Sequence, residues 1–352
     1  MMAVTNKDFR QFVRLLTRRT QLWTEMRVDR HVCHADTQAG GADEWVLDFG
    51  ANEHPIVCQL GGSCPETLSQ AARIVRSWGY DEINLNCGCP SDRVNGHAGE
   101  FGASLMRKPQ LVRDCARSMA VASQVPVSVK CRLGVDDEDT PEFTANFVRV
   151  VATAGVRHFI VHARKCVLNM GLTPQQNRTI PPLRPDRVLR LCREFPELDF
   201  TLNGGVTSLA EVRGILESAP PNLAGVMLGR AVRDHPCMLA DADRLVFGQA
   251  SSPPTASSRR ALLSAYCDYL DAQHPPGGKT AMAPSRGLID SALLPVTTAF
   301  RGVPGKKLVT SALGPTGLSR DAGVRARGPG HILREVVSML EADPRSARAL
   351  DE

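Results

Sequence analysis

The feature that most constrains the fold is a regular alternation of short β-rich runs with segments of helical periodicity. Such alternation forms parallel β/α units. It therefore predicts an α/β protein, either a TIM-type (β/α)8 barrel or a doubly wound open sheet. Strands are predicted at 21–26, 55–60, 82–86, 126–131, 158–162, 199–203 and 225–228, with helices at 65–78, 109–123, 141–154, 184–195 and 208–218.

Polar residues at the ends of the predicted strands favour the barrel. In a barrel the carboxyl ends of all strands surround one mouth, where active sites of this fold lie. Seven strands are predicted and a helix at 7–18 opens the chain, so the strand that an eight-stranded barrel still needs would be its first. Closing a barrel without it would expose two edges. The strand-end residues are Gln59, Asn86, Lys130, His162, Asn203 and Gly229.

A second, smaller unit is predicted after the barrel. A helix at 236–247 closes the barrel domain (residues 1–247), and the composition of 248–258 is typical of a linker. Residues 259–352 are predicted to be helical at 260–270, 288–300 and 331–341, with Pro295 interrupting the second of these helices. The Gly- and Pro-rich stretches 281–286 and 314–330 are expected to be poorly ordered.

Composition limits the compartment and the partners. The chain has no apolar run long enough to span a membrane, and its eleven scattered cysteines favour a reducing compartment, either cytoplasmic or organellar, over secretion. Between residues 301 and 327 six basic residues accompany one acidic residue, which favours an anionic partner, RNA ahead of a membrane. A solvated basic face is the alternative.

Two cysteines follow the predicted strand 82–86. A cysteine on a loop at the mouth of a barrel can act as a nucleophile, a metal ligand or an acid. A single Cys-x-Cys pair lacks the further ligands that a metal needs, so no metal is expected. Cys87, at the end of the strand, is predicted to be buried and unreactive, which leaves Cys89 as the candidate for chemistry.

Basic and glycine-rich strand ends suggest an anionic ligand. Alternation places Lys130 on the same strand face as Ser128 and Arg132, and a buried ammonium requires an anion, an electron-rich partner or a core carboxylate. Loops after the last two strands of a TIM barrel commonly bind phosphate. Here those loops carry the pairs Gly204–Gly205 and Gly229–Arg230, which predict a phosphorylated cofactor.

Eight motifs together resemble the tRNA-dihydrouridine synthases, and the PSDRV and NRTIPP segments are similar to their A-type branch. The resemblance covers roughly residues 4–247, although residues 1–6 match only the end of the motif that follows the family's first barrel strand. The motifs are QLGG (59–62), YDEINLNCGCPSDRV (80–94), FGASLM (101–106), VPVSVKCRLG (125–134), HARK (162–165), NRTIPP (177–182), LNGG (202–205) and MLGR (227–230).

The resemblance implies a TIM barrel with FMN in its mouth, NADPH as reductant and a small C-terminal helical domain that binds tRNA. Cys89 would be the general acid that protonates C5 of a uracil, near position 20 of the D-loop, while the flavin delivers hydride to C6. Neither a membrane nor an obligate protein partner is implied. FMN would contact Gln59, Lys130, His162, Asn203, Gly204, Gly205, Gly229 and Arg230, and the substrate tRNA would contact Asn86, Arg93, Arg164, Lys165 and Arg178.

Two other functions remain open at the level of sequence. One is a different FMN barrel, similar to dihydroorotate dehydrogenases, that acts on a free pyrimidine. The other is an RNA-binding protein that has lost its flavin.

Overall fold

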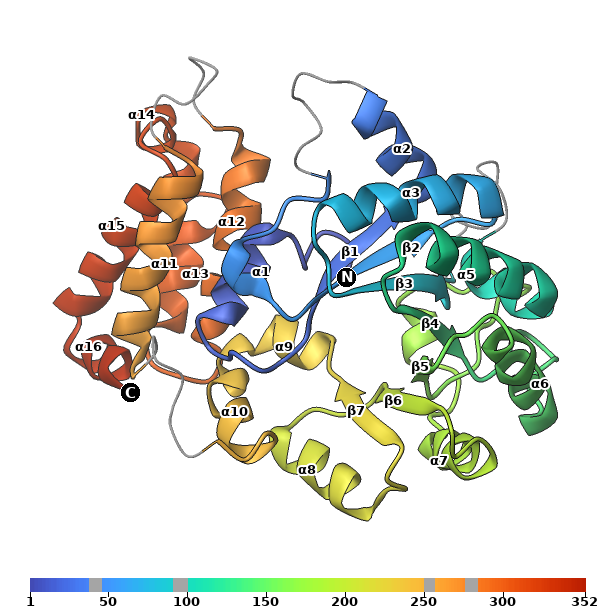
Figure 1. Cartoon of the computed structure of the whole chain (residues 1–352). Coiled ribbons are helices and arrows are strands. Elements are labelled where there is room, and N and C mark those ends of the chain that lie inside the picture. The colour runs from blue at the N-terminus through green and yellow to red at the C-terminus, as the bar shows by residue number, and fades with distance from the viewer. Residues whose placement is uncertain (38–45, 91–100, 250–256, 276–283) are drawn as a thin grey trace.

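A single parallel sheet organises the first two thirds of the chain. The computed structural model describes residues 1–37, 46–90, 101–249, 257–275 and 284–352. Each strand pairs in parallel with the next along the chain, and Figure 1 shows the sheet curling from β1 round to β7. The strands are β1 (Leu22–Val28), β2 (Ile56–Gly61), β3 (Glu82–Cys87), β4 (Val127–Arg132), β5 (His158–His162), β6 (Asp199–Asn203) and β7 (Leu223–Met227).

The strand order settles the choice between the two predicted windings. A doubly wound sheet reverses its strand order at one point, whereas this sheet keeps sequence order throughout. The predicted α/β fold with barrel-type winding is therefore confirmed. Figure 1 shows the connecting helices on the outside of the sheet: α3 (Pro65–Ser77), α5 (Pro109–Ser123), α6 (Pro141–Ala152), α7 (Pro185–Glu194) and α8 (Leu209–Ser218).

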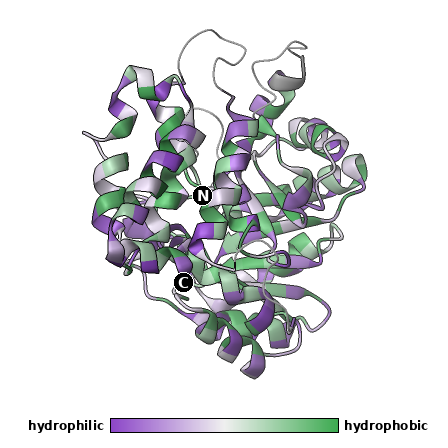
Figure 2. Ribbon diagram, turned by 90° about the vertical axis from the view of Figure 1, so that its left-hand side faces the viewer, coloured by the Kyte–Doolittle hydropathy of each residue, from purple (hydrophilic) through white to green (hydrophobic). Residues whose placement is uncertain are grey.

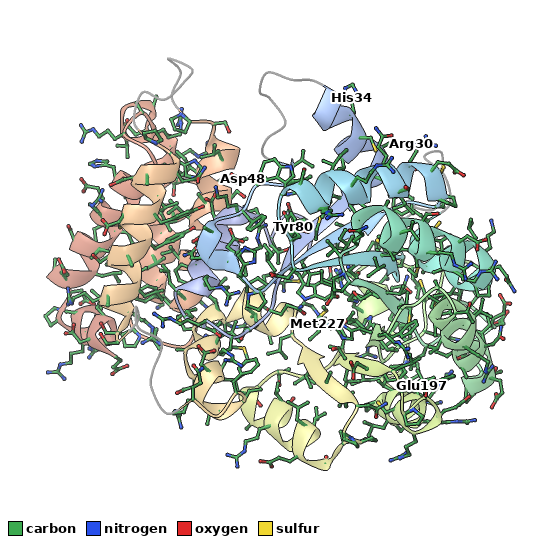
Figure 3. The ribbon with its side chains drawn as sticks, viewed as in Figure 1. Arg30, His34, Asp48, Tyr80, Glu197 and Met227 are labelled. Atoms are coloured by element: carbon green, nitrogen blue, oxygen red, sulfur yellow. The ribbon has the colours of Figure 1, made fainter. Side chains whose placement is uncertain are left out.

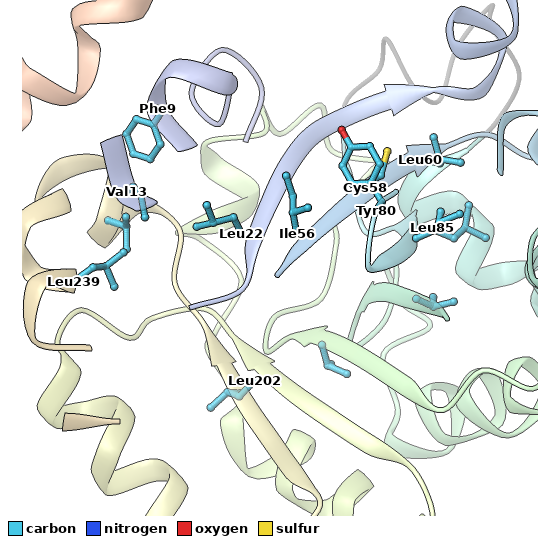
Figure 4. Packing of buried hydrophobic residues seen from close by; sticks show 14 of the residues in the cluster. Phe9, Val13, Leu22, Ile56, Cys58, Leu60, Tyr80, Leu85, Leu202 and Leu239 are labelled. Atoms are coloured by element: carbon cyan, nitrogen blue, oxygen red, sulfur yellow. The ribbon is translucent and has the colours of Figure 1, made fainter. Parts of the chain in front are cut away.

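The starts of these helices explain why the sequence predicted them so closely. Four of the five begin with proline, whose missing N–H costs nothing in the first helical turn. Thr140 caps α6 and Ser208 caps α8 through their hydroxyl oxygens. The core lies between the helices and the sheet, and Figure 4 shows Ile56 and Leu60 of β2 with Leu85 of β3, all fully buried.

Two helix predictions in the barrel region were wrong in extent. The first helix, α1, ends at Arg14 (Lys7–Arg14) because the guanidinium of Arg14 donates to the carbonyls of Thr17 and Thr20 and stabilises a turn there. The predicted helix 236–247 is divided into a 3-10 helix, η5 (Pro236–Asp241), and a short α10 (Ala242–Leu245), which follow α9 (Arg230–Asp234). A helix that was not predicted, α2 (Asp29–Thr37), follows β1.

The C-terminal third is helical, as predicted, but two details differ. Pro295 does not interrupt its helix: it is buried inside α12, where the hydroxyl of Tyr266 donates to the carbonyl of Ala292, 2.6 Å away, one turn earlier. The stretch 314–330 contains η6 (Leu318–Arg320) and α14 in place of the expected poor order. The helices are α11 (Arg259–Gln273), α12 (Arg286–Ala299), α13 (Lys306–Leu313), α14 (Ala322–Arg325), α15 (Pro329–Ala342) and α16 (Pro344–Asp351).

Helix α1 packs between the sheet and the C-terminal helices (Figure 1). The Asp8 carboxylate accepts from the Tyr269 hydroxyl at 2.8 Å and lies 3.1 Å from Nε2 of His274. The ring of Phe12 meets that of Tyr266 edge-on at 5.0 Å. Hydrophilic and hydrophobic residues alternate along the helices in Figure 2, as expected for elements that bury one side.

Two sequence-level predictions are only partly addressed by the fold. Residues 250–256 of the predicted linker and 281–283 of the expected poorly ordered stretch lie outside the described residues, so the domain division remains a prediction.

No helix in the described part of the chain combines the length and the apolar character that crossing a bilayer requires.

Candidate functional site

The polar strand ends predicted from the sequence meet at one end of the sheet, which we call the mouth. Nδ2 of Asn86 donates to Oε1 of Gln59 at 2.9 Å, and Nζ of Lys130 donates to Oδ1 of Asn203 at 3.1 Å. Asn203 in turn donates to the carbonyl of Met227, 2.9 Å away at the end of β7 (Figure 3). Side chains at the mouth thereby connect β2 with β3, and β4 with β6 and the end of β7.

The turn that carries Cys89 is held from three sides. Oδ1 of Asn86 accepts from the backbone N–H groups of Gly88 and Cys89, at 3.0 and 2.9 Å. The Cys89 carbonyl accepts from Ala103 N–H at 2.9 Å, and Nε of Arg132 donates to the Gly88 carbonyl at 2.9 Å. Cys89 is half-buried here, and its turn follows the end of β3, where Asn86 pairs with Lys130 of β4.

Cys87 differs from Cys89 as predicted. Its side chain is fully buried in the core, and burial raises the pKa of the Cys87 thiol well above its ordinary value. A thiol in that environment stays neutral and out of reach of a ligand at the mouth. The structure therefore leaves Cys89 as the cysteine of this pair that can take part in chemistry.

Arg132 is a site residue to which sequence reasoning gave no role. It is buried, and besides Gly88 it donates to the carbonyls of Lys165 and Asn177, each at 3.0 Å. Burial, and then the nearby guanidinium groups, lower its pKa. The sequence signal that could have identified Arg132 is its position two residues after Lys130, on the same face of the strand. The three carbonyls it contacts, however, lie far apart in the sequence.

Residues 163–184, between β5 and α7, form an ordered excursion beside the mouth. Buried Asn177 bonds both the N–H and the carbonyl of Val167, at 2.7 and 2.9 Å. Asp136, with a φ of +51°, accepts from the N–H groups of Leu168 and Asn169. Neither Asn177 nor Asp136 was predicted as a site residue, because their partners are backbone groups that only the fold brings close.

The predicted substrate residue Lys165 belongs to this segment and is half-buried against the loop that follows β4. Its ammonium donates to the Asp136 carbonyl at 2.8 Å and lies 3.3 Å from the Asp139 carboxylate. Arg93, also predicted to contact the substrate, lies outside the described residues.

Cations at the mouth repel one another. Burial and then Arg230 lower the pKa of Arg164, and burial followed by Arg230 and Arg233 lowers that of Arg178. Burial is also the main reason that the pKa of His162 falls far below its ordinary value, with nearby cations adding to the effect. Groups that destabilise each other's charge in this way favour an anion among them.

Two consecutive glycines after β6 are required by their surroundings. Gly204 and Gly205 have φ values of +108° and +83°. A Cβ on Gly204 would lie 2.6 Å from the His162 ring, and one on Gly205 would lie 2.3 Å from Cδ2 of Leu183. The backbone here therefore packs closely against the side chains of His162 and Leu183, in a conformation that glycine adopts readily.

Replacing Gly205 with alanine is expected to lower the free energy of unfolding by about 1–3 kcal/mol, because the methyl group would meet Leu183 in a backbone conformation unfavourable to alanine. Urea denaturation measures the change. Gly214→Ala in α8 is the matched control: nothing lies within 4 Å of its Cβ position, so this variant should gain stability. Equal effects at the two positions would show that the surroundings of Gly205 do not require a glycine.

The half-buried Lys130 is expected to make stability depend on pH. Burial, and then Arg132, lowers its pKa from 10.5 to about 8. Between those two values the unfolded chain binds more protons than the folded protein, so the free energy of unfolding rises with pH across this window. We expect the stability of the wild type relative to Lys130→Met to increase between about pH 7 and 10 in urea denaturation. A pH-independent difference would contradict the lowered pKa.

The fold and the site together define an α/β protein with a cation-rich mouth at the carboxyl ends of a curled parallel sheet. The family model for dihydrouridine synthase (Dus) matches residues 1–283, and the chain belongs to this family.

Relatives named tRNA-dihydrouridine(20/20a) synthase support the assignment. The chain is 46% identical to the Xanthomonas campestris protein over 273 residues, which are 78% of this chain and 76% of that one. It is 42% identical to the Synechocystis protein over 271 residues, 77% and 76% of the two chains. Against the Shewanella oneidensis protein it is 38% identical over 324 residues, 92% and 89% of the two chains.

Proposed function

We propose that this chain reduces uridine in tRNA to 5,6-dihydrouridine, using FMN bound at the mouth and NADPH as reductant. Family membership and the names of the relatives support the reaction and point to uridines 20 and 20a. The observation that carries the proposal is the placement of Cys89. It lies on a turn fixed from three sides, one of them by Arg132, at the strand ends where Lys130 pairs with Asn86.

The residues at the mouth fit an FMN molecule. Gly204 and Gly205 leave backbone N–H groups accessible to its phosphate, and the Arg230 guanidinium lies nearby, bonded to the Arg178 carbonyl at 3.2 Å. The Gln59 amide donates one N–H to Asn84 and accepts from Asn86, which leaves a second N–H and a lone pair for the pyrimidine ring of the flavin. His162, Asn203 and Gly229 complete the proposed contacts.

The chain's own groups would then handle the proton and the substrate. Reduced FMN, when bound, supplies the hydride that C6 of the uracil receives. Cys89 donates the proton to C5, which requires a neutral thiol held in a fixed position by Asn86 and Arg132. Lys130 provides a positive charge beside the reacting groups.

The tRNA would be bound by residues outside the reacting centre. The target base must leave the stacked tRNA to reach the mouth. Arg164 and Arg178 at the rim would contact phosphate or base, with Asn86 closer to Cys89. The C-terminal helices would form the tRNA-binding domain, and the exposed Lys306 and Lys307 at the start of α13 suit a phosphate backbone.

The test combines purified protein, FMN, NADPH and an unmodified tRNA transcript, followed by mass spectrometry of the tRNA nucleosides. Dihydrouridine at position 20 or 20a is the expected result. Reduction of a free pyrimidine without tRNA modification would instead establish a different FMN enzyme. Salt-sensitive tRNA binding without flavin binding would establish an RNA-binding protein that has lost the reaction.

A further inference from the structure

A continuous chain of hydrogen bonds runs through the interior of the sheet toward the Cys89 turn. Asn86 accepts from the turn and donates to Oε1 of Gln59, and Nε2 of Gln59 donates to Oδ1 of Asn84 at 2.9 Å. Nδ2 of Asn84 donates to the Ser128 hydroxyl at 2.8 Å, and Ser128 donates to the carboxylate of Glu82. Register explains the arrangement, because Gln59 pairs with Asn84, and Asn84 with Ser128, on neighbouring strands.

The two ends of this chain determine the direction of every bond in it. At the mouth, the backbone N–H groups of Gly88 and Cys89 can only donate. At the other end, the carboxylate of Glu82 accepts from the Ser128 hydroxyl. Each amide between them therefore has one satisfactory orientation, since turning any of them would place N–H against N–H or oxygen against oxygen.

Burying these polar groups costs free energy, so their presence in the core requires an explanation. Asn84 and Ser128 are buried to within 1% of complete, in a sheet interior that branched apolar side chains usually fill. Burying polar groups gains little stability even when they are paired. A fixed direction of hydrogen bonding is something that an apolar core would not provide.

We propose that Asn84, Ser128 and Glu82 are positioning residues that act through Gln59 and Asn86 to fix the Cys89 turn. They also fix which atoms Gln59 presents to the flavin. The consequence for catalysis rests on the proposed function, whereas the consequence for the turn does not. None of the three touches Cys89 in the described contacts, so their effect must pass along the chain of hydrogen bonds.

Ser128→Ala tests the proposal with a small change, and Thr201→Val is the matched control. Thr201 lies in the same interior and bonds Nε2 of His158 at 2.8 Å; among the described residues it forms no hydrogen bond to the chain and is linked to its far end only through His158, whose Nδ1 lies 3.7 Å from the Glu82 carboxylate. The first measurement needs neither cofactor nor tRNA: the rate of alkylation of Cys89 by iodoacetamide, resolved by peptide mass spectrometry. Cys64, half-buried in the β2–α3 loop, serves as internal reference.

We expect Ser128→Ala to increase the alkylation rate of Cys89 while that of Cys64 stays constant, and Thr201→Val to change neither. In single-turnover experiments Ser128→Ala should slow reduction of uridine by about tenfold, as expected for loosened positioning. Glu82→Gln keeps an acceptor for Ser128 and should behave as wild type. Glu82→Leu removes that acceptor and should resemble Ser128→Ala.

Equal Cys89 alkylation in Ser128→Ala and Thr201→Val, with both variants folded by circular dichroism, would overturn the proposal. If alkylation responds as expected but the wild type makes no dihydrouridine, the positioning of the turn stands and the proposed function fails. If Glu82→Leu does not fold, the comparison of Ser128→Ala with Thr201→Val still decides the question.

Discussion

Cys89→Ala is expected to lower the single-turnover rate of dihydrouridine formation by a factor of about 10²–10⁴, the usual contribution of a positioned general acid. The methyl group cannot supply the proton that C5 of the uracil needs. Flavin binding and NADPH oxidation should persist, because the turn is held through backbone groups of residues 88 and 89 and not through the thiol. Stopped-flow absorbance and nucleoside mass spectrometry measure the two half-reactions separately.

Cys64→Ala is the control for this variant. Cys64 is also half-buried and also follows a strand, but its thiol bonds the Glu66 carboxylate at 2.9 Å, away from the Cys89 turn. It should leave both half-reactions unchanged. Full dihydrouridine formation by Cys89→Ala would show that the proton comes from another group.

Arg132→Met is expected to impair both stability and uridine reduction. The substitution leaves three carbonyls, at positions 88, 165 and 177, without their donor. Each buried acceptor left unpaired costs about 1–3 kcal/mol, partly offset because a buried guanidinium is itself costly. Since the Gly88 carbonyl belongs to the Cys89 turn, the single-turnover rate should fall by about 10- to 100-fold.

Arg187→Met separates the two effects of Arg132→Met. Arg187 likewise donates to backbone carbonyls, those of Asp139 and Leu133, and a methionine in its place should destabilise the same side of the sheet. It makes no contact with the Cys89 turn in the described residues. Urea denaturation should therefore show a loss of stability in both variants, and only Arg132→Met should be slow in single turnover. Equal rates would assign Arg132 a purely structural role.

The strands and most helices could be predicted because local signals agree with the global fold. Polar residues at strand ends, and prolines at helix starts, are visible in the sequence. The sequence did not predict α2, which lies between the first two predicted strands, or the continuity of α12 through Pro295, near which the distant Tyr266 donates to the Ala292 carbonyl. Contacts between residues that are remote in the sequence cannot be read from a local pattern.

In the candidate site, too, features with a local sequence signal were predicted, whereas contacts between remote residues were not. Alternation along β4 placed Lys130 at the mouth, and register confirms that it lies beside Asn86. The roles of Arg132 and Asn177 were not predicted because their partners are backbone atoms of other loops. Asn84 was also missed as a site residue, since its importance appears only when the pairing of β2, β3 and β4 is known.

Helix α1 couples the stability of the sheet to that of the C-terminal helices. Separating the C-terminal helices from the sheet would expose Phe12 and Tyr266 to water and leave the Asp8 carboxylate without its two partners. Neither part can therefore melt without uncovering the surface of the other, and calorimetry should record one heat-absorption peak for the whole chain. A substitution in α11 that weakens this contact would then reduce the amount of intact mouth in a cell, although it lies far from Cys89 in the sequence.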